Sequence, residues 1–175
     1  LGSPQTEDRL IFGEGSEEDR WFSPHVAEDG TLVVVSARGT AKDHEVFRMK
    51  LDGPATKLEG LSGAISYLGS RGGVLFFLAD RSRILRWADG RWSDVVPASS
   101  EAIDHAALVG DHFIVASVKD AGPQFRVVSF DGKRVRALDV PPGNVWGPPW
   151  GPGFAGQRSS PLAFFSVSGL ADAGS

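Results

Sequence analysis

The chain has 175 residues, of which 41% are hydrophobic, carries a formal net charge of −4 and contains no cysteine. Its lysines and arginines are scattered singly, which argues against the clustered basic surface of a nucleic-acid-binding protein. A disulfide framework and thiolate chemistry are excluded, and no apolar run approaches the length of a membrane span. The N-terminus does not resemble a signal peptide. From the length we expect one domain, and from the charge pattern and apolar runs no nucleic-acid or membrane partner. The absence of cysteine fits the cytoplasm or the periplasm.

The N-terminal part of the chain predicts short strands separated by turns. Residues 9–12 indicate a lone strand, the outer strand of a partial blade that ends at residue 19. A first full blade is expected over residues 20–62, with turns at Asp29-Gly30 and Asp52-Gly53 because glycine tolerates the backbone of a tight hairpin. Its four strands are predicted near residues 22–26, 32–37, 45–51 and 56–58.

The same organisation continues along the chain. A second blade is expected over residues 63–99, with strands at 65–68, 74–78, 83–87 and 92–96. A third blade is expected over residues 100–142, with strands at 104–109, 112–118, 124–130 and 135–140. A partial blade over residues 143–175 begins with strands 144–146 and 162–167, which are separated by a loop rich in proline and glycine at 148–156. No apolar stripe of helical period occurs, so no sizeable helix is expected.

The apolar runs repeat at a nearly constant interval. The runs centred on residues 34, 76 and 114 lie 42 and 38 residues apart. A period of about 40 residues with four short strands in each unit is typical of a β-propeller. The sequence therefore predicts an all-β fold of about three complete four-stranded antiparallel blades and two partial ones, as an internal segment of a larger propeller.

Catalytic and metal-binding patterns are absent from the sequence. No Gly-x-Ser-x-Gly elbow occurs, and the four histidines show no metal-ligand spacing. Paired carboxylates lie in expected turns, so neither a cofactor nor a metal is predicted. Trp87 and Trp92 are expected to pack between blades, whereas Trp146 and Trp150 could either face a partner or plug their own loop.

Several segments form an ordered set along the chain. Residues 1–12 read LGSPQTEDRLIF, and Trp21 follows. Next come the strand at 28–36, the loop Arg38-Gly39-Thr40, the strand at 45–51 and the turn at 140–145. Together these segments resemble the prolyl oligopeptidase family, and the resemblance covers essentially the whole chain.

This resemblance implies a fold and a function for the longer protein. Members of the family are serine peptidases that cut short peptides after proline, with a seven-bladed propeller over an α/β-hydrolase domain. We therefore expect this chain to be the gating, size-selecting propeller part of such an enzyme, with no catalytic residue of its own. The implied partners are proline-containing short peptides and the hydrolase domain of the same protein, which is expected to be a monomer.

The resemblance also implies a small set of substrate-binding residues. By position these are Phe22, Arg38 and Thr40, where Thr40 replaces a cysteine of some members. The alternative is that Phe22 packs between blades and Arg38 makes a surface ion pair. For the whole chain, the alternative function is a non-catalytic propeller scaffold for protein–protein interaction, although the Gly-His and Trp-Asp dipeptides of one scaffold class are missing. A propeller glycosidase is disfavoured because the expected inner strands lack carboxylates.

Overall fold

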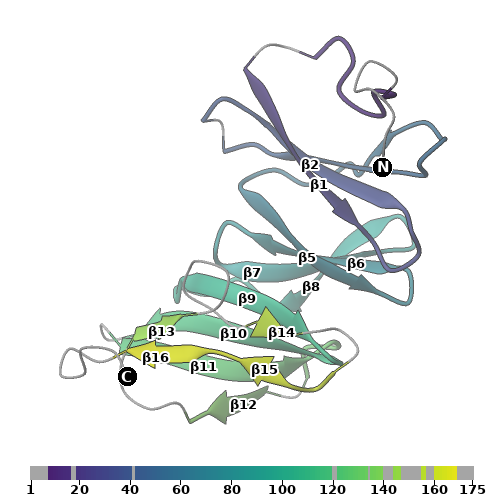
Figure 1. Cartoon of the computed structure of the whole chain (residues 1–175). Helices are drawn as coiled ribbons and strands as arrows, with labels where there is room; N and C mark the ends of the chain where they lie inside the picture. Colours follow the sequence, from purple (N-terminus) through teal and green to yellow (C-terminus); the bar gives the residue numbers. More distant parts are fainter. Residues whose placement is uncertain are drawn as a thin grey trace.

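The computed structural model describes residues 8–16, 19–40, 42–119, 122–133, 135–139, 144–146, 155–156 and 160–168. This part of the chain forms three four-stranded antiparallel sheets, each with its strands in chain order (Figure 1). It includes no helix long and apolar enough to cross a membrane. The all-β prediction of successive four-stranded blades is confirmed.

Each blade uses four consecutive strands. Blade 1 consists of β1 (Arg20–Val26), β2 (Leu32–Arg38), β3 (Glu45–Met49) and β4 (Thr56–Lys57). Blade 2 consists of β5 (Ile65–Arg71), β6 (Val74–Ala79), β7 (Arg83–Ala88) and β8 (Arg91–Val96). Blade 3 consists of β9 (Ile103–Val109), β10 (His112–Lys119), β11 (Gly122–Ser129) and β12 (Val135–Leu138).

A fourth unit follows blade 3. β13 (Asn144–Trp146) pairs with β16 (Ser166–Ser168), and β14 (Ala155–Gly156) pairs with β15 (Ala163–Phe164). The expected strand at 162–167 is therefore divided between β15 and β16, and β14 lies within the segment predicted as a loop. Since β14 contacts β9, this unit continues the row of blades (Figure 1).

Two boundary predictions are wrong for identifiable reasons. Residues 9–12 do not form a strand, because Phe12 instead packs its ring against Phe22 and Phe47 at centroid distances of 5.3 and 5.2 Å. Strand β5 extends to Arg71 rather than ending at residue 68. The two-residue turn uses Gly72 and Gly73 at φ values of 54° and 81°, so that Arg71 can still pair with Val74.

The continuous apolar runs belong to the second strand of each blade, which is buried on both faces. In β6, Leu75 and Phe77 pack into the core between blades 1 and 2, whereas Phe76 packs into the core between blades 2 and 3. In β10, Phe113 faces blade 2 and Ile114 belongs to the core on the opposite face. Side chains alternate between the two faces of a strand, so one short run supplies two cores.

The blades approach one another near their first two strands. β2 contacts β5, β5 contacts β9, and β9 contacts β14, whereas no outer strands of neighbouring described blades make comparable contacts. The sheets therefore diverge from β1, β5 and β9 toward β4, β8 and β12, as the blades of a propeller do. Space remains beside the outer strands of blade 1, where a groove opens toward blade 2, whereas the β11–β12 turn of blade 3 stays close to β8 of blade 2.

Candidate functional site

The turns between strands gather at two ends of the blades, because the strands alternate in direction. The β1–β2, β5–β6 and β9–β10 turns lie at one end, called here the first-turn end. The β2–β3 and β6–β7 turns lie at the opposite end, called the second-turn end. Loops at strand ends are where folds of this kind place binding residues.

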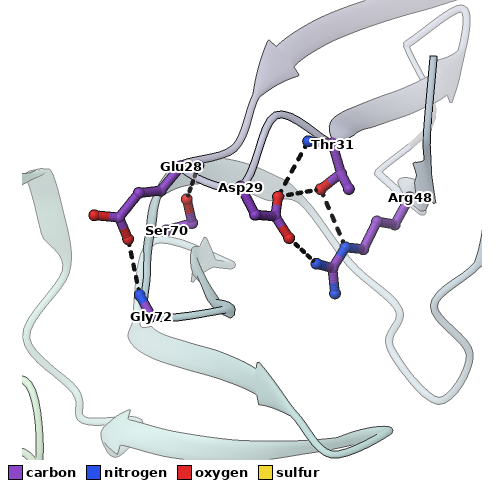
Figure 2. A network of polar contacts seen from close by, with 6 residues as sticks. All are labelled: Glu28, Asp29, Thr31, Arg48, Ser70 and Gly72. Carbon is purple, nitrogen blue, oxygen red and sulfur yellow. Dashed lines mark hydrogen bonds and ion pairs between the residues drawn. The ribbon is translucent and has the colours of Figure 1, made fainter.

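Neighbouring blades are joined directly at the first-turn end. The Glu28 amide donates to Ser70 Oγ at 2.7 Å, and the Gly72 amide donates to Glu28 Oε2 at 2.8 Å (Figure 2). These two bonds join blade 1 to blade 2. An ion pair of 2.7 Å between Arg71 and Asp111 joins blade 2 to blade 3. Together they form a continuous row of contacts across three blades.

A second row of contacts joins the blades at the second-turn end. The Ile65 amide lies 3.0 Å from His44 Nδ1, which joins the β2–β3 loop to blade 2. The Arg81 carbonyl accepts a 2.6 Å hydrogen bond from the Ile103 amide. Asp80 and Arg81 both adopt a φ of 50°, a left-handed conformation that costs energy for residues with a Cβ. Hydrogen bonds of Asp80 with Ala64 and of Arg81 with Ile103 hold this conformation in place.

Arg38 and Thr40 lie at the second-turn end of blade 1. Arg38 ends β2, is exposed, and forms an ion pair of 3.2 Å with Asp19. Thr40 is exposed in the turn that follows. The Gly39 amide donates to the Asp19 carbonyl at 2.8 Å, so the loop that presents both residues is fixed to the start of β1.

Phe22 lies on the same blade but contacts a different region. Its half-buried side chain borders a cavity of about 390 Å³ between blade 1 and residues 10–16. Phe12 closes over it in an edge-to-face contact. Arg38 and Thr40 are not among the lining residues, so the structure does not bring the three predicted residues into one pocket. Phe22 packs against Phe12 of the segment that precedes blade 1, and Arg38 forms a surface ion pair with Asp19.

The floor of this cavity carries a charged cluster. Arg20 pairs with Glu45 and donates to Ser36 Oγ at 3.1 Å. Lys57 pairs with the same Glu45 at 2.7 Å. The hydrogen bond from Lys57, followed by that from Arg20, lowers the pKa of Glu45, and the same Lys57–Glu45 bond raises the pKa of Lys57. The carboxylate stays ionised and is shared by two cations, so it is poorly suited to act as a general acid.

A serine and a histidine approach each other on β1. Ser23 Oγ lies 3.1 Å from His25 Nε2, and both side chains point toward blade 2. Burial lowers the pKa of His25, whose ring also packs 5.0 Å from that of Tyr67. Within the described residues no carboxylate hydrogen bonds to His25. The pair therefore lacks the orienting third member of a catalytic triad, and sequence reasoning missed it although positions i and i+2 of a strand share a face.

Other predicted features have mixed outcomes. Trp87 and Trp92 pack against the core between blades 1 and 2, with ring centroids 4.8 Å apart, so that prediction is confirmed. The side chain of Trp146 and the whole of Trp150 lie outside the described residues. Among the residues described, no cluster of three potential metal-ligating side chains occurs.

Comparison with known proteins gives a consistent picture. The family model described as "Prolyl oligopeptidase, N-terminal beta-propeller domain" matches residues 1–172. A prolyl endopeptidase of Elizabethkingia miricola is 26% identical over 96% of this chain, and one of Elizabethkingia meningoseptica is 24% identical over 96%. The chain spans only 25% of the length of each of these two relatives.

Solved structures agree with the sequence matches. A structure from an analysis of two prolyl endopeptidases superposes with a TM-score of 0.82 at 25% identity, covering 96% of this chain and 26% of that chain. Prolyl oligopeptidase B from Galerina marginata, bound to a 35mer hydrolysis and macrocyclization substrate, gives a TM-score of 0.78 at 13% identity and covers 96% and 25% of the two chains. The second likeness supports the fold alone.

Proposed function

The chain belongs to the family of prolyl oligopeptidase N-terminal β-propeller domains, and from that premise we propose that it is the gating propeller of a serine peptidase that cleaves short peptides after proline. The match of the family model over residues 1–172 is the observation that carries this proposal. The proposed catalytic triad belongs to an α/β-hydrolase domain outside this chain. The blade limits proposed from the sequence, at residues 19, 62, 99 and 142, belong to the same proposal.

The contacts between blades support a role in restricting access. Two buried cores and two rows of polar contacts join blades 1, 2 and 3. Packed sheets of this kind resist deformation, because shifting one blade disrupts both adjoining cores. A rigid ring over an active site would admit short extended peptides and exclude folded proteins.

The activity test uses the full-length protein. We expect it to hydrolyse a short peptide with a chromogenic group after proline, and to lose that activity to a serine-directed phosphonate. The same proline-containing sequence placed inside a folded protein should not be cleaved. A full-length protein that lacks hydrolysis would instead support the alternative of a non-catalytic scaffold.

The gating part of the proposal has its own test. The double substitution Glu28→Ala with Arg71→Ala removes two of the three contacts that join the blades at the first-turn end and leaves the bond from the Glu28 amide to Ser70 Oγ in place. We expect cleavage of peptides of 30 or more residues to increase severalfold relative to short ones, while Lys42→Ala, an exposed lysine, changes nothing. An unchanged dependence on peptide length would refute gating by these contacts but not the peptidase activity.

We further propose that Phe22, Arg38 and Thr40 contribute to peptide binding. The exposed guanidinium of Arg38 can donate to a peptide carbonyl while it keeps one contact with Asp19. Arg38→Ala should raise KM several-fold with little change in kcat, whereas Asp19→Ala, which removes only the ion pair, should leave KM unchanged. Equal effects of the two substitutions would assign Arg38 a structural role.

A further inference from the structure

The outer strands of blade 1 and β7 of blade 2 enclose a groove of about 500 Å³. We propose that this inter-blade groove binds an acidic peptide segment that also carries an apolar side chain. It lies at the end of blade 1 that is opposite to Arg38 and Thr40, so it is separate from the proposed substrate contacts. The residues that line it are Asp29, Thr31, Arg48, Met49, Lys50, Gly53, Pro54, Thr56, Lys57, Leu58 and Trp87.

The floor of the inter-blade groove is apolar. Met49 and Leu58 are buried with exposed fractions of 6% and 5%, and Trp87 forms the wall from blade 2. Trp87 is held by Trp92, whose indole nitrogen donates to the Glu59 carbonyl at 2.8 Å. A fixed indole beside buried aliphatic side chains offers a preformed surface for one apolar side chain of a ligand.

The rim of the groove is cationic. Arg48 is oriented by Asp29 and by Thr31 Oγ1, to which its Nε donates at 3.2 Å (Figure 2). This leaves Arg48 Nη1 with no partner among the described residues. Lys50 is exposed and forms no ion pair with any described residue. Lys57 adds a third cation, which is also paired with Glu45 outside the lining of the groove.

The charges of the groove favour an anionic ligand. Three cations and one carboxylate line it, whereas the chain as a whole carries a net charge of −4. Asp29 is paired with Arg48, and hydrogen bonds from Thr31 and Arg48 lower its pKa, so Lys50 supplies the unpaired positive charge of the lining. Carboxylates of a ligand would therefore meet a local excess of positive charge.

The shape of the groove favours a peptide over a small anion. Its volume of about 500 Å³ exceeds what one inorganic anion fills, and its apolar floor would remain uncovered. The groove also follows Thr56 and Lys57 of β4, which is the last strand of its sheet. An edge strand offers backbone groups to an extended peptide, and the alternating side chains of that peptide would reach the floor and the rim.

The experiment measures binding to the full-length protein by fluorescence anisotropy. The probe is a fluorescein-labelled peptide of sequence Glu-Asp-Phe-Asp-Glu, which contains no proline and is therefore not a substrate of the proposed peptidase. We expect saturable binding that weakens with salt, and a loss of at least tenfold in affinity in Lys50→Glu and in Trp87→Ala. The matched control Lys42→Glu, an exposed lysine of the β2–β3 loop, should stay within twofold of the unmodified protein.

Several outcomes would overturn the inference. These are the absence of saturable binding, equal losses in Lys50→Glu and Lys42→Glu, and equal affinity for a Lys-Arg-Phe-Arg-Lys peptide. Competition by free glutamate or phosphate as strong as by the peptide would reduce the groove to a small-anion site. A loss of post-proline hydrolysis in Lys50→Glu alone would assign the groove to the substrate path. The binding and competition readouts do not depend on whether the peptidase proposal holds.

Discussion

Gly132, in the turn between β11 and β12, offers a direct measure of how closely blades 2 and 3 are packed. A Cβ added to Gly132 would lie 2.0 Å from the Val95 carbonyl oxygen of β8, a backbone atom that cannot rotate away. Gly30, in the β1–β2 turn, has nearly the same backbone, with a φ of 78° against 72°, but nothing within 4 Å of an added Cβ. The two alanine substitutions therefore differ in the clash and share the backbone strain.

The magnitudes follow from this comparison. Alanine in the left-handed region costs about 1–2 kcal/mol, which is partly offset by the lower entropy of the unfolded chain. Gly30→Ala should therefore destabilise by about 1 kcal/mol. Gly132→Ala adds the cost of overpacking between two backbones, about 1–3 kcal/mol. We expect a difference of about 2 kcal/mol between the two variants, which corresponds to a factor of about 30 in an opening equilibrium.

Amide hydrogen exchange on the full-length protein provides the assay. Peptides that cover β8 and β11 should exchange about 30-fold faster in Gly132→Ala than in Gly30→Ala, because the clash forces these two strands apart. Peptides from blade 1 should respond much less to Gly132→Ala than those of β8 and β11, because the clash lies between blades 2 and 3. Equal exchange in β8 for both variants would refute the close approach of Gly132 to Val95.

Three further predictions concern burial and titration. Phe77 is fully buried in the core between blades 1 and 2, so Phe77→Ala should lower the free energy of unfolding in urea by about 3–5 kcal/mol. Phe164 is 66% exposed, so Phe164→Ala should lower it by less than about 0.5 kcal/mol. The pKa of Asp29 is lower in the folded state, so the stability that its carboxylate contributes is present at neutral pH and is lost as the pH falls through the folded-state pKa. Hydrogen exchange of the Thr31 amide, which donates to Asp29, should therefore rise below about pH 4 relative to its intrinsic rate. Asp29→Asn should remove that rise. Burial lowers the pKa of His25, so the stability that its neutral ring contributes is complete above about pH 6.5 and is lost as the pH falls below that value. His25→Asn should reduce the loss of protein stability between about pH 7 and 5. NMR titration should place the pKa of His25 below 6.5.

The repeat of apolar runs predicted the blades because it has a direct physical cause. Each run supplies side chains to two cores, so every position in it must be apolar. The result is an unbroken apolar stretch in the sequence, such as that of β6. The turns were predictable for a similar reason, since Gly72 and Gly73 adopt backbones that few other residues tolerate. Local chemistry and patterning therefore specified the order and type of the strands.

Contacts between blades could not be predicted from local patterns. Glu28 reaches Ser70 and Gly72 across 42 and 44 residues, and nothing in either segment alone indicates the other. Their separation is close to the blade period, which is the one signal that could have paired them. Residues 9–12 were assigned as a strand by composition, yet Phe12 is positioned by the rings of Phe22 and Phe47. Tertiary packing decided this segment, and likewise separated Phe22 from Arg38 and Thr40.

The double use of the second strands makes the blades thermodynamically interdependent. Because Leu75 and Phe77 serve one core while Phe76 serves the next, loosening β6 weakens two interfaces at once. The blades therefore behave as a row of nearest-neighbour-coupled units, in which the opening of one raises the opening probability of both neighbours. A single-residue insertion in β6 would exchange the side chains presented to the two cores, so length variation among relatives should be confined to turns and excluded from these strands.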